Sequence, residues 1–448
     1  MFSKILIANR GEIAVRILRA CREMGIETVV VFSEADRDAL HVSMADESIC
    51  IGSAMSKDSY LRMDAILSAA VCTGAQAIHP GYGFLSENAT FAELCAKCQI
   101  DFIGPSAEII RSMGNKEEAR RTMQKAGVPV IPGTDVLENV EEAREKAAGI
   151  GFPVLIKARS GGGGRGIRLV QAEAEFDTAF SSASAEAEAA FGDGGVYLEK
   201  YLFPVKHIEV QLLADKHGTV VCLGERDCSI QRKNQKVLEE CPAPGISSEI
   251  REKMMKAATL AAKAVGYQNA GTIEFLLDQE GHFYFMEMNT RLQVEHPVTE
   301  MATGIDLVKW QLRIAAGQPL TIVQEEVALR GCAIECRINA ENPLLHFRPC
   351  SGKVTLLHVP GGPWVRFDTA IYQDYIIPPF YDAMIGKLIV HARTREEAIR
   401  KMQAALSELV IEGVDHNGQL HMEILEAPSF VSGSYTTDFL HKAGILGC

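Results

Sequence analysis

Short apolar runs alternate with amphipathic stretches over the first 110 residues of the chain. Residues 4–8 and 28–32 are dominated by aliphatic and β-branched side chains, and 77–78 and 102–103 continue the series. Between the first two runs, the apolar positions from 13 to 18 fit a helix. Strands that alternate with helices in this way are typical of a doubly wound parallel sheet. The pattern therefore predicts an N-terminal α/β domain.

The next stretch of the chain has a different rhythm. Residues 116 to about 133 predict a helix and then a Pro-Gly break, and 152–158 and 167–170 predict two strands joined by glycines. An alanine-rich helix over 172–191 and an extended segment over 196–199 complete this small unit. Because its tip is rich in glycine, we expect it to act as a mobile flap over a binding site.

Length, charge and hydropathy bound the class of protein. Strands and helices alternate from about 204 to 330, and another α+β region follows; at roughly 100–200 residues per domain, 448 residues predict two to four domains. The formal net charge of −13 would repel nucleic acid. No apolar run approaches the ~18 residues that cross a bilayer, and the N-terminal apolar stretch is too short for a signal peptide. We therefore expect a cytoplasmic protein that binds neither nucleic acid nor membrane.

A glycine-rich turn follows the strand predicted at 152–158. Residues 161–166 match G-x-G-x-x-G as a string, but a strand follows them instead of the helix that a dinucleotide motif opens. Ile167 stands where a Walker A loop needs lysine. Glycines let backbone N–H groups approach phosphate oxygens closely, and Lys157 adds a cation on the incoming strand. The segment indicates a phosphate-binding hairpin, with a flexible surface hairpin as the alternative.

Two carboxylates face each other in the hairpin predicted over 271–289. If its turn is centred at 280–281, Glu274 lies directly opposite Glu287, and facing carboxylates repel unless a cation lies between them. Strand alternation places Asn289 on the same face as Glu287. Oxygen donors without sulfur or imidazole suit Mg²⁺ that is shared with a polyphosphate. The alternative is a charged hairpin edge that blocks aggregation.

Further charged residues extend this picture on both sides of the hairpin. If the extended path continues past Asn289, the side chains of Arg291, Gln293 and Glu295 join the same face. Upstream, residues 225–236 end in a cationic cluster of Arg232, Lys233 and Lys236. A solvated basic loop is one interpretation of that cluster. Beside a polyphosphate site in an acidic chain, an anion-binding role is the better hypothesis.

Taken together, these motifs resemble those of biotin carboxylase, the ATP-grasp subunit of bacterial acetyl-CoA carboxylase. The matching segments occur in the family's order over nearly the whole chain: 7–14 (IANRGEIA), 79–88 (HPGYGFLSEN), 160–166 (SGGGGRG), 225–232 (ERDCSIQR), 287–300 (EMNTRLQVEHPVTE) and 381–388 (YDAMIGKL). The resemblance implies a Rossmann-like N-terminal domain over 1–114. It also implies an ATP-grasp domain over 115–332, with a glycine-rich lid at about 131–203, and an α+β C-terminal domain over 333–448.

The resemblance also implies which residues bind ATP and metal. ATP would be bound by Lys116, Lys157, Gly163, Gly164, Glu199, Lys200, Tyr201, Leu202, His207, Gln231, Asn234, Glu274 and Glu287. Glu274, Glu287 and Asn289 would hold two Mg²⁺ or Mn²⁺ ions, which agrees with the hairpin argument.

The remaining site residues would carry the chemistry. Bicarbonate would be bound by Lys236, Arg291, Gln293 and Val294. Glu295 would be the base that deprotonates it, Arg337 would bind biotin and stabilise its ureido anion, and Lys236 and Arg291 complete the catalytic set. Arg16 and Asp382 resemble a remote pair near the family's dimer and domain interface.

The implied reaction is the first half-reaction of acetyl-CoA carboxylase. ATP phosphorylates bicarbonate, carboxyphosphate breaks down to CO₂ and phosphate, and biotin attacks the CO₂. The chain contains no Met-Lys-Met, so we expect biotin to arrive as a substrate on a separate biotin carboxyl carrier protein, with carboxyltransferase subunits as further partners. The family also implies a homodimer.

Two segments depart from the family pattern. Asn234 stands where many members have histidine, so we expect a modest change in ATP affinity. The loop 346–352 (HFRPCSG) is an unusual version of a C-terminal loop. Neither change touches the metal or bicarbonate residues.

Three alternatives remain at this point. The chain could serve a propionyl-CoA, pyruvate or other carboxylase, could be another ATP-grasp ligase of the carbamoyl-phosphate or peptide type, or could be a non-catalytic nucleotide-binding regulatory subunit. The intact residues Lys236, Arg291, Glu295 and Arg337 favour the catalytic interpretation.

Overall fold

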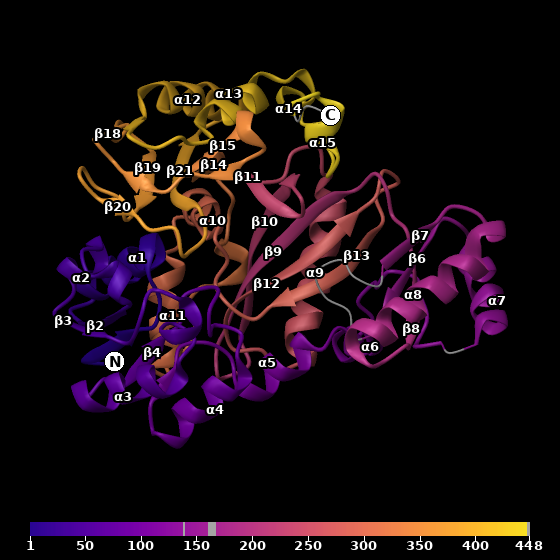
Figure 1. Ribbon diagram of the computed structural model, residues 1–448, viewed down its shortest axis with the longest axis horizontal. Coiled ribbons are helices and arrows are strands. Elements are labelled where there is room, and N and C mark those ends of the chain that lie inside the picture. Colours follow the sequence, from indigo (N-terminus) through magenta and orange to yellow (C-terminus); the bar gives the residue numbers. More distant parts are fainter. Residues whose placement is uncertain (138, 160–166, 446–448) are drawn as a thin grey trace.

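The computed structural model describes residues 1–137, 139–159 and 167–445 of the chain. Figure 1 shows the N-terminal part at the lower left, the C-terminal part at the top, and a small outlying part at the right that contains β6, β7, β8, α7 and α8. No helix in these three described stretches is long and apolar enough to cross a bilayer.

The N-terminal part is the parallel sheet that the apolar rhythm predicted. Its five strands lie in the order β3-β2-β1-β4-β5, and every neighbouring pair is parallel. Ile5 and Ile7 share one core cluster with α1 and α11, whereas Leu6 between them packs on the opposite face. Because both faces are covered, the strands are continuous apolar runs. The elements are β1 (Lys4–Ile7), α1 (Gly11–Glu23), β2 (Glu27–Phe32), α2 (Leu40–Met44), β3 (Glu47–Cys50), α3 (Met63–Thr73), β4 (Ala77–His79), α4 (Ala89–Lys97), β5 (Asp101–Phe102) and α5 (Ala107–Gly114).

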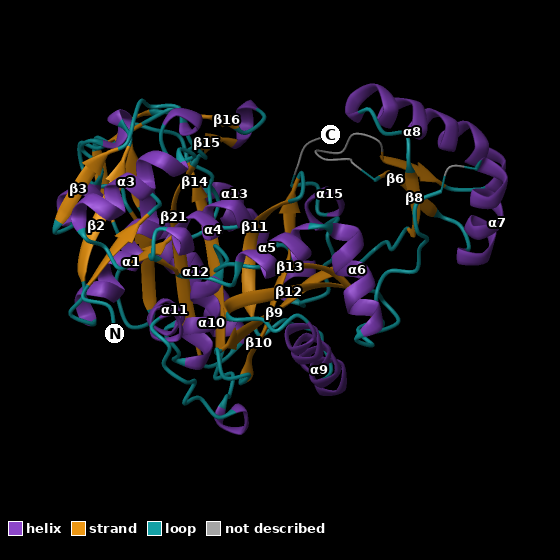
Figure 2. Cartoon of the chain, turned by 90° about the horizontal axis from the view of Figure 1, so that it is seen from below, coloured by secondary structure: helices purple, strands orange, loops and turns teal. Residues whose placement is uncertain are grey.

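The outlying part corresponds to the predicted flap. An antiparallel sheet in the order β7-β6-β8 carries α7 and α8, and the unit has a core of its own around Ile156 and Phe176. Figure 2 shows it standing away from the rest of the molecule. Its elements, with the helix that leads into them, are α6 (Lys116–Lys125), α7 (Val140–Ile150), β6 (Val154–Ala158), β7 (Ile167–Val170), α8 (Phe176–Phe191) and β8 (Val196–Lys200).

One antiparallel sheet joins the middle of the chain to its C-terminal part. Its eight strands lie in the order β13-β12-β9-β10-β11-β14-β21-β19. β14 begins at Cys332, so the predicted boundary at 333 falls inside a strand and not between sheets. The elements are β9 (Lys206–Ala214), β10 (Val220–Arg232), β11 (Gln235–Cys241), α9 (Ser248–Ala264), β12 (Asn269–Leu277), β13 (Phe283–Asn289), α10 (His296–Thr303), α11 (Leu307–Ala315), β14 (Cys332–Asn339), β19 (Val365–Thr369) and β21 (Met384–Ala392).

Helices and small strand pairs cover the C-terminal half of this sheet. α12 packs on β14 and β21 over a core that includes Ile334, Leu388 and Met402. The remaining elements are β15 (Glu341–Asn342), β16 (Arg348–Pro349), β17 (Gly352–Lys353), β18 (Leu356–His358), β20 (Ile376–Ile377), α12 (Arg395–Glu408), β22 (Val410–Glu412), α13 (Gly418–Glu426), α14 (Pro428–Val431) and α15 (Phe439–Lys442).

A buried histidine in α2 makes the stability of the fold depend on pH. Burial lowers the pKa of His41 to about 4, despite the opposing pull of Asp36. Below pH 6.5 the unfolded chain binds a proton that the folded chain refuses, so stability falls as the pH drops from 6.5 toward 4. We expect a loss of about 2 kcal/mol from this residue at pH 5. His41→Asn should therefore narrow the difference in thermal midpoint between pH 7 and pH 5. His282→Asn, on an exposed turn, is the control and should leave that difference unchanged. If both variants respond equally, the pH dependence does not come from His41.

Candidate active site

Charged residues cross four neighbouring strands of the long sheet in one row. Arg226 of β10 lies opposite Glu209 of β9, Glu209 opposite Glu274 of β12, and Glu274 opposite Glu287 of β13. The last pairing is the one predicted from the hairpin turn. Side chains directly opposite in an antiparallel pair are close neighbours, so the row needs cations to offset its carboxylates.

Arg226 neutralises one end of this row. Its Nε donates to Glu209 at 2.5 Å, and its terminal nitrogens donate to the Gln211 amide and to the hydroxyls of Thr272 and Thr299. The side chain is fully buried. A buried guanidinium with all these acceptors is a fixed part of the site and not a group that is free to bind an anion.

Lys236 of β11 neutralises the middle of the row. Its ammonium lies 2.6 Å from Glu209, 3.0 Å from Glu274 and 2.5 Å from Glu295. Burial alone would lower the pKa of Lys236, but these carboxylates outweigh it and raise the pKa well above its usual value. The lysine is therefore charged, and it gathers carboxylates from three separate segments of the chain at one point.

The segment after β13 leaves the strand but keeps its side chains at the site. β13 ends at Asn289 and α10 begins at His296, so the conditional expectation of an extended path to Glu295 is wrong. Arg291 nevertheless donates to the Asn289 side-chain oxygen at 3.0 Å, and Gln293 donates to Glu274 at 3.0 Å. The loop folds back over the hairpin because these polar side chains bind it there.

Glu295 joins the hairpin to the C-terminal part of the molecule. One of its oxygens meets Lys236, and the other accepts a hydrogen bond from Arg337 of β14 at 2.9 Å. Burial would raise the pKa of Glu295, but Lys236, Arg337 and Arg226 hold it well below its usual range. The carboxylate is therefore ionised at neutral pH. Arg337 itself is held from the other side by Glu239 at 2.6 Å.

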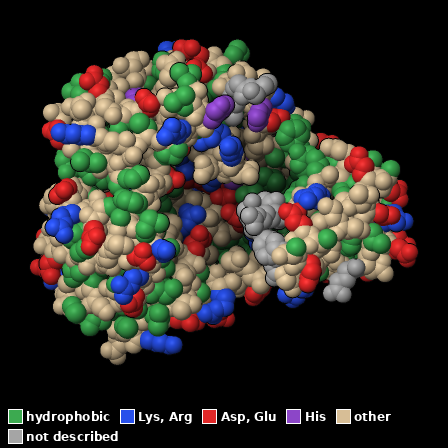
Figure 3. Space-filling view, in the orientation of Figure 1, with side chains coloured by type: hydrophobic (Ala, Val, Ile, Leu, Met, Phe, Trp, Pro, Cys, Tyr) green, Lys and Arg blue, Asp and Glu red, His purple; other side chains and the backbone are tan. Residues whose placement is uncertain are grey.

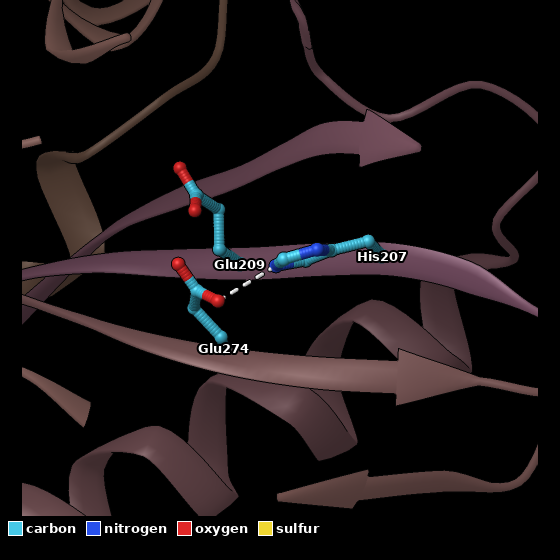
Figure 4. A group of neighbouring side chains, drawn as sticks. All are labelled: His207, Glu209 and Glu274. Atoms are coloured by element: carbon cyan, nitrogen blue, oxygen red, sulfur yellow. Dashed lines mark ion pairs between the residues drawn. The ribbon is translucent and has the colours of Figure 1, made fainter. Parts of the chain in front are cut away.

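His207 forms a compact group with Glu209 and Glu274 (Figure 4). The Gln231 amide nitrogen donates both to the Cys228 carbonyl and to His207 Nδ1, and His207 Nε2 lies 2.9 Å from Glu274. Because Lys236 and Arg226 already offset the two carboxylates, this group is not a separate metal centre.

Glu287 offers the better place for a divalent cation. No ion pair reaches its carboxylate from the described residues, and burial, reinforced by the facing Glu274, raises its pKa. Asn289 adds an amide oxygen on the same face, beside a cavity of about 200 Å³ that Lys116 also lines. A cation between the two carboxylates would relieve both the burial and the repulsion. The donor set, all oxygen, therefore fits Mg²⁺.

A larger cavity of about 1680 Å³ opens between β8, the β10–β11 turn and the C-terminal helices. Figure 3, in the same orientation as Figure 1, shows a hollow in the middle of the molecule, with acidic and basic side chains inside it. Four of the residues predicted to bind ATP line the cavity: Tyr201, Leu202, Gln231 and Asn234. Its volume exceeds what one nucleotide needs.

The other predicted ATP residues have different surroundings. Lys157 of β6 forms an ion pair with Glu199 of β8 in the outlying part, and the Lys200 ammonium donates to the Gly151 and Phe152 carbonyls. Lys200 is therefore turned toward its own lobe. Gly163 and Gly164 lie outside the described residues, so their predicted contact with phosphate stays a prediction.

The departures from the family pattern have local physical reasons. Lys233 and Asn234 form the two-residue turn between β10 and β11, both with positive φ of 49° and 63°. Asparagine tolerates this left-handed conformation better than most residues. In the unusual 346–352 loop, the Phe347 ring lies under the Arg232 guanidinium at 3.9 Å. The loop thus packs onto the cationic cluster.

The remote pair has separate partners. Arg16 of α1 bonds to Glu300 of α10 at 2.8 Å and to Asp306 at 2.7 Å, while Asp382 accepts from the Met384 backbone. Arg16 therefore joins the N-terminal part to α10 and to the start of α11, and it makes no hydrogen bond with Asp382 within the described residues.

Sequence reasoning missed several residues of this network. They are Glu87, which binds Arg291 at 2.9 Å, together with Glu209, Arg226, Glu239 and Lys387. The available signal was the alternation of His207, Glu209 and Gln211 with the apolar residues of the segment from 207 to 214. Buried charge in a central strand is rare unless it is paired. The other contacts join segments far apart in the chain and left no local pattern.

Family models match almost the entire chain. Residues 1–110 match "Biotin carboxylase, N-terminal domain", 115–323 match "Carbamoyl-phosphate synthase L chain, ATP binding domain", and 335–442 match "Biotin carboxylase C-terminal domain". The middle match alone would also admit a carbamoyl-phosphate ligase, whereas the N- and C-terminal matches are both to biotin carboxylase domains.

Whole-chain relatives agree with these matches. The chain is 57% identical to Biotin carboxylase 1 of Bacillus subtilis over 100% of both proteins, and 55% identical to biotin carboxylase of Haemophilus influenzae over 99% of both. It is similar to the crystal structure of a biotin carboxylase–ATP complex from Campylobacter jejuni, with 50% identity, 99% of each chain covered and a TM-score of 0.93. A 2-oxoglutarate carboxylase biotin carboxylase domain dimer from Hydrogenobacter thermophilus, bound to MgADP, ADP and bicarbonate, is 48% identical with a TM-score of 0.91, over 100% of this chain and 99% of that one.

Proposed function

The chain belongs to the biotin carboxylase family, and on that premise we propose that it uses ATP to carboxylate biotin with bicarbonate. One observation supports this most directly: the hairpin with Glu274 and Glu287 meets Arg337 of the C-terminal part through Lys236 and Glu295. A site for phosphoryl transfer and a guanidinium suited to an oxyanion are thereby joined in one network.

The reaction we propose has two stages. Bicarbonate attacks the γ-phosphoryl group of ATP, giving ADP and carboxyphosphate. Carboxyphosphate then breaks down to CO₂ and phosphate; the phosphate takes the ureido proton of biotin, and the biotin nitrogen attacks the CO₂. Glu274, Glu287 and Asn289 would hold Mg²⁺, which when bound supplies positive charge to the transferred phosphoryl group.

The side chains of the network divide this work. Lys236, Arg291 and Gln293 bind bicarbonate with the backbone at Val294. Glu295 is already ionised, so it can accept the bicarbonate proton as that anion meets Lys236. Arg337 then presents its planar fork of donors to the oxygen of the biotin ureido anion.

The nucleotide lies in the large cavity in this proposal. Tyr201, Leu202, Gln231 and Asn234 line it on the adenosine side, and Lys116 and His207 lie toward the hairpin that meets the phosphates. Lys157, Glu199, Lys200, Gly163 and Gly164 belong to the lid, which closes over the phosphates and keeps water from carboxyphosphate.

We further propose the setting of the reaction. The biotin arrives on a biotin carboxyl carrier protein in the cytoplasm, the chain works as a homodimer, and carboxyltransferase subunits pass the carboxyl group to acetyl-CoA. The domain borders at 114/115 and 332/333 belong to the same proposal.

Steady-state ATP cleavage tests the function directly. We expect ADP release to require bicarbonate and to rise several-fold when free biotin is added, because biotin consumes the CO₂ from carboxyphosphate. A chain that cleaves ATP with bicarbonate but shows no response to biotin, and forms no carboxybiotin from labelled bicarbonate, is not a biotin carboxylase.

A substitution at Glu287 tests the metal assignment. Glu287→Gln keeps the shape of the side chain but removes the charge that faces Glu274. We expect the Mg²⁺ concentration for half-maximal rate to rise at least about tenfold. Glu249→Gln, on an exposed face of α9, is the matched control and should leave the titration unchanged. An unaltered metal titration in Glu287→Gln would remove this residue from the metal site.

A further inference from the structure

Lys387 is a buried cation that the proposed chemistry does not use. It lies in β21, directly opposite Arg337 of β14 on one side and Asp368 of β19 on the other. Its side chain is 0% exposed. A buried ammonium is costly unless hydrogen bonds and counter-charges offset the loss of water, so its partners indicate what it holds in place.

Two acceptors from different parts of the chain meet this ammonium. Nζ donates to the Val294 carbonyl at 2.8 Å and lies 3.1 Å from a Glu12 oxygen in α1. The Tyr82 hydroxyl donates to that same Glu12 oxygen, and the Tyr82 ring centroid lies 5.8 Å from Nζ. Lys387 therefore joins the N-terminal part and the loop before α10 to the C-terminal end of the long sheet.

The contact with Val294 fixes the direction of one peptide group. The peptide between Val294 and Glu295 is trans, so its carbonyl and its N–H point in opposite directions. A bond that draws the carbonyl to Lys387 thus turns the Glu295 N–H away from Lys387. Within the described residues, no acceptor meets the N–H of either Val294 or Glu295. The loop therefore keeps backbone donors available beside the Glu295 carboxylate.

Resting on the proposed function, we propose that Lys387 is a positioning residue for the bicarbonate site. Its ammonium holds the Val294 carbonyl and so orients the backbone donors and the base Glu295. Because Lys387 and Arg337 face each other in adjacent strands, the same pair of strands carries the anchor of the base and the guanidinium offered to biotin. Lys387 touches neither substrate and acts only through the loop.

The test compares bicarbonate and ATP as separate substrates. Lys387→Met keeps the length of the side chain and removes the donor. We expect the KM for bicarbonate to rise at least about tenfold, as for the loss of a charge-assisted hydrogen bond that places a binding loop. The KM for ATP should stay within about twofold, because ATP does not depend on the Val294 peptide. Lys387→Arg, which keeps a donor and the charge, should restore part of the bicarbonate affinity.

Glu12→Gln is the matched control for the domain contact. It removes the negative charge of the other partner of Lys387 but leaves the bond to Val294, so the KM for bicarbonate should stay within about twofold. If Glu12→Gln and Lys387→Met raise that KM equally, the lysine is only a link between domains and the proposal is overturned. The proposal is also overturned if the KM for ATP rises in parallel with that for bicarbonate.

Stability and the wild-type chain complete the design. If Lys387→Met does not fold because Glu12 is left unpaired, the double variant Glu12→Gln/Lys387→Met carries the same test without a buried lone charge. The wild-type protein is assayed first for bicarbonate-dependent ATP cleavage with biotin. A wild-type chain without that activity contradicts the proposed function, whereas an active wild type with an unchanged Lys387→Met contradicts only the role of Lys387.

Discussion

Replacing Glu295 with glutamine is expected to lower bicarbonate-dependent turnover by about 10²–10⁴-fold, the range that a general base contributes, while ATP still binds. The carboxylate is fully buried between the Lys236 ammonium at 2.5 Å and the Arg337 guanidinium at 2.9 Å. Glutamine keeps the shape and can still accept a hydrogen bond, but it cannot take a proton from bicarbonate. The loss should therefore fall on kcat, and the affinity for ATP should change little.

The fold should tolerate this change because each cation keeps another partner. Lys236 retains Glu209 and Glu274, and Arg337 retains Glu239. ADP release with saturating bicarbonate gives the rate, and calorimetric titration with ATP gives the affinity. Circular dichroism checks that the variant is folded.

Glu239→Gln is the matched control for Glu295→Gln. Glu239 is equally buried and also binds Arg337, but it does not contact Lys236, and burial raises its pKa to about 7. Glu239→Gln should therefore lower the turnover rate by at most about tenfold. If the two variants lose equal activity, the charge around Arg337 matters and proton transfer at Glu295 does not explain the effect.

The acidic hairpin shows how much of the site a local pattern can predict. A turn centred at 280–281 predicts Glu274 opposite Glu287, thirteen positions later, and that pairing is confirmed. The pairs nearest the turn, from Leu277–Phe283 to Phe275–Phe285, are centred on residue 280. A register shift between Glu274 and Phe275 completes the pairing, and the sequence pattern carried no signal for that shift. The same reasoning placed Asn289 beside them. It failed beyond Asn289, since the path of a loop depends on the side chains that bind it, and periodicity carries no information about them.

Lys387 marks the limit of that approach. It is the last residue of the YDAMIGK motif and is one polar position in an apolar strand. Its partners, however, are Glu12 and Val294, which lie 375 and 93 positions earlier. No spacing rule connects them. Only the assembly of the three parts around the long sheet brings these groups together, and for the same reason the sheet runs through the predicted border at 333.

Replacing Arg337 with alanine is expected to lower the rate of biotin carboxylation by about 10²–10³-fold, while bicarbonate-dependent cleavage of ATP persists. The side chain of Arg337 binds Glu239 and Glu295. Within the described residues, it makes no hydrogen bond or ion pair with the residues that line the nucleotide cavity. Without its fork of donors, the ureido anion of biotin loses its stabilising partner. Carboxyphosphate should still form, and its CO₂ should be lost to water.

The variant also leaves two buried carboxylates without their shared cation, so stability needs its own control. Arg395→Ala removes a guanidinium that binds the buried Glu240 at 2.7 and 2.8 Å on the same sheet, outside the site. Breaking either pair should cost about 3–5 kcal/mol of stability. Labelled carboxybiotin and ADP are measured in both variants. In Arg337→Ala, carboxybiotin should fall while ADP release persists, whereas in Arg395→Ala the two products should stay coupled. If both variants lose carboxybiotin and ADP in parallel, Arg337 acts through the fold and has no direct part in carboxylation.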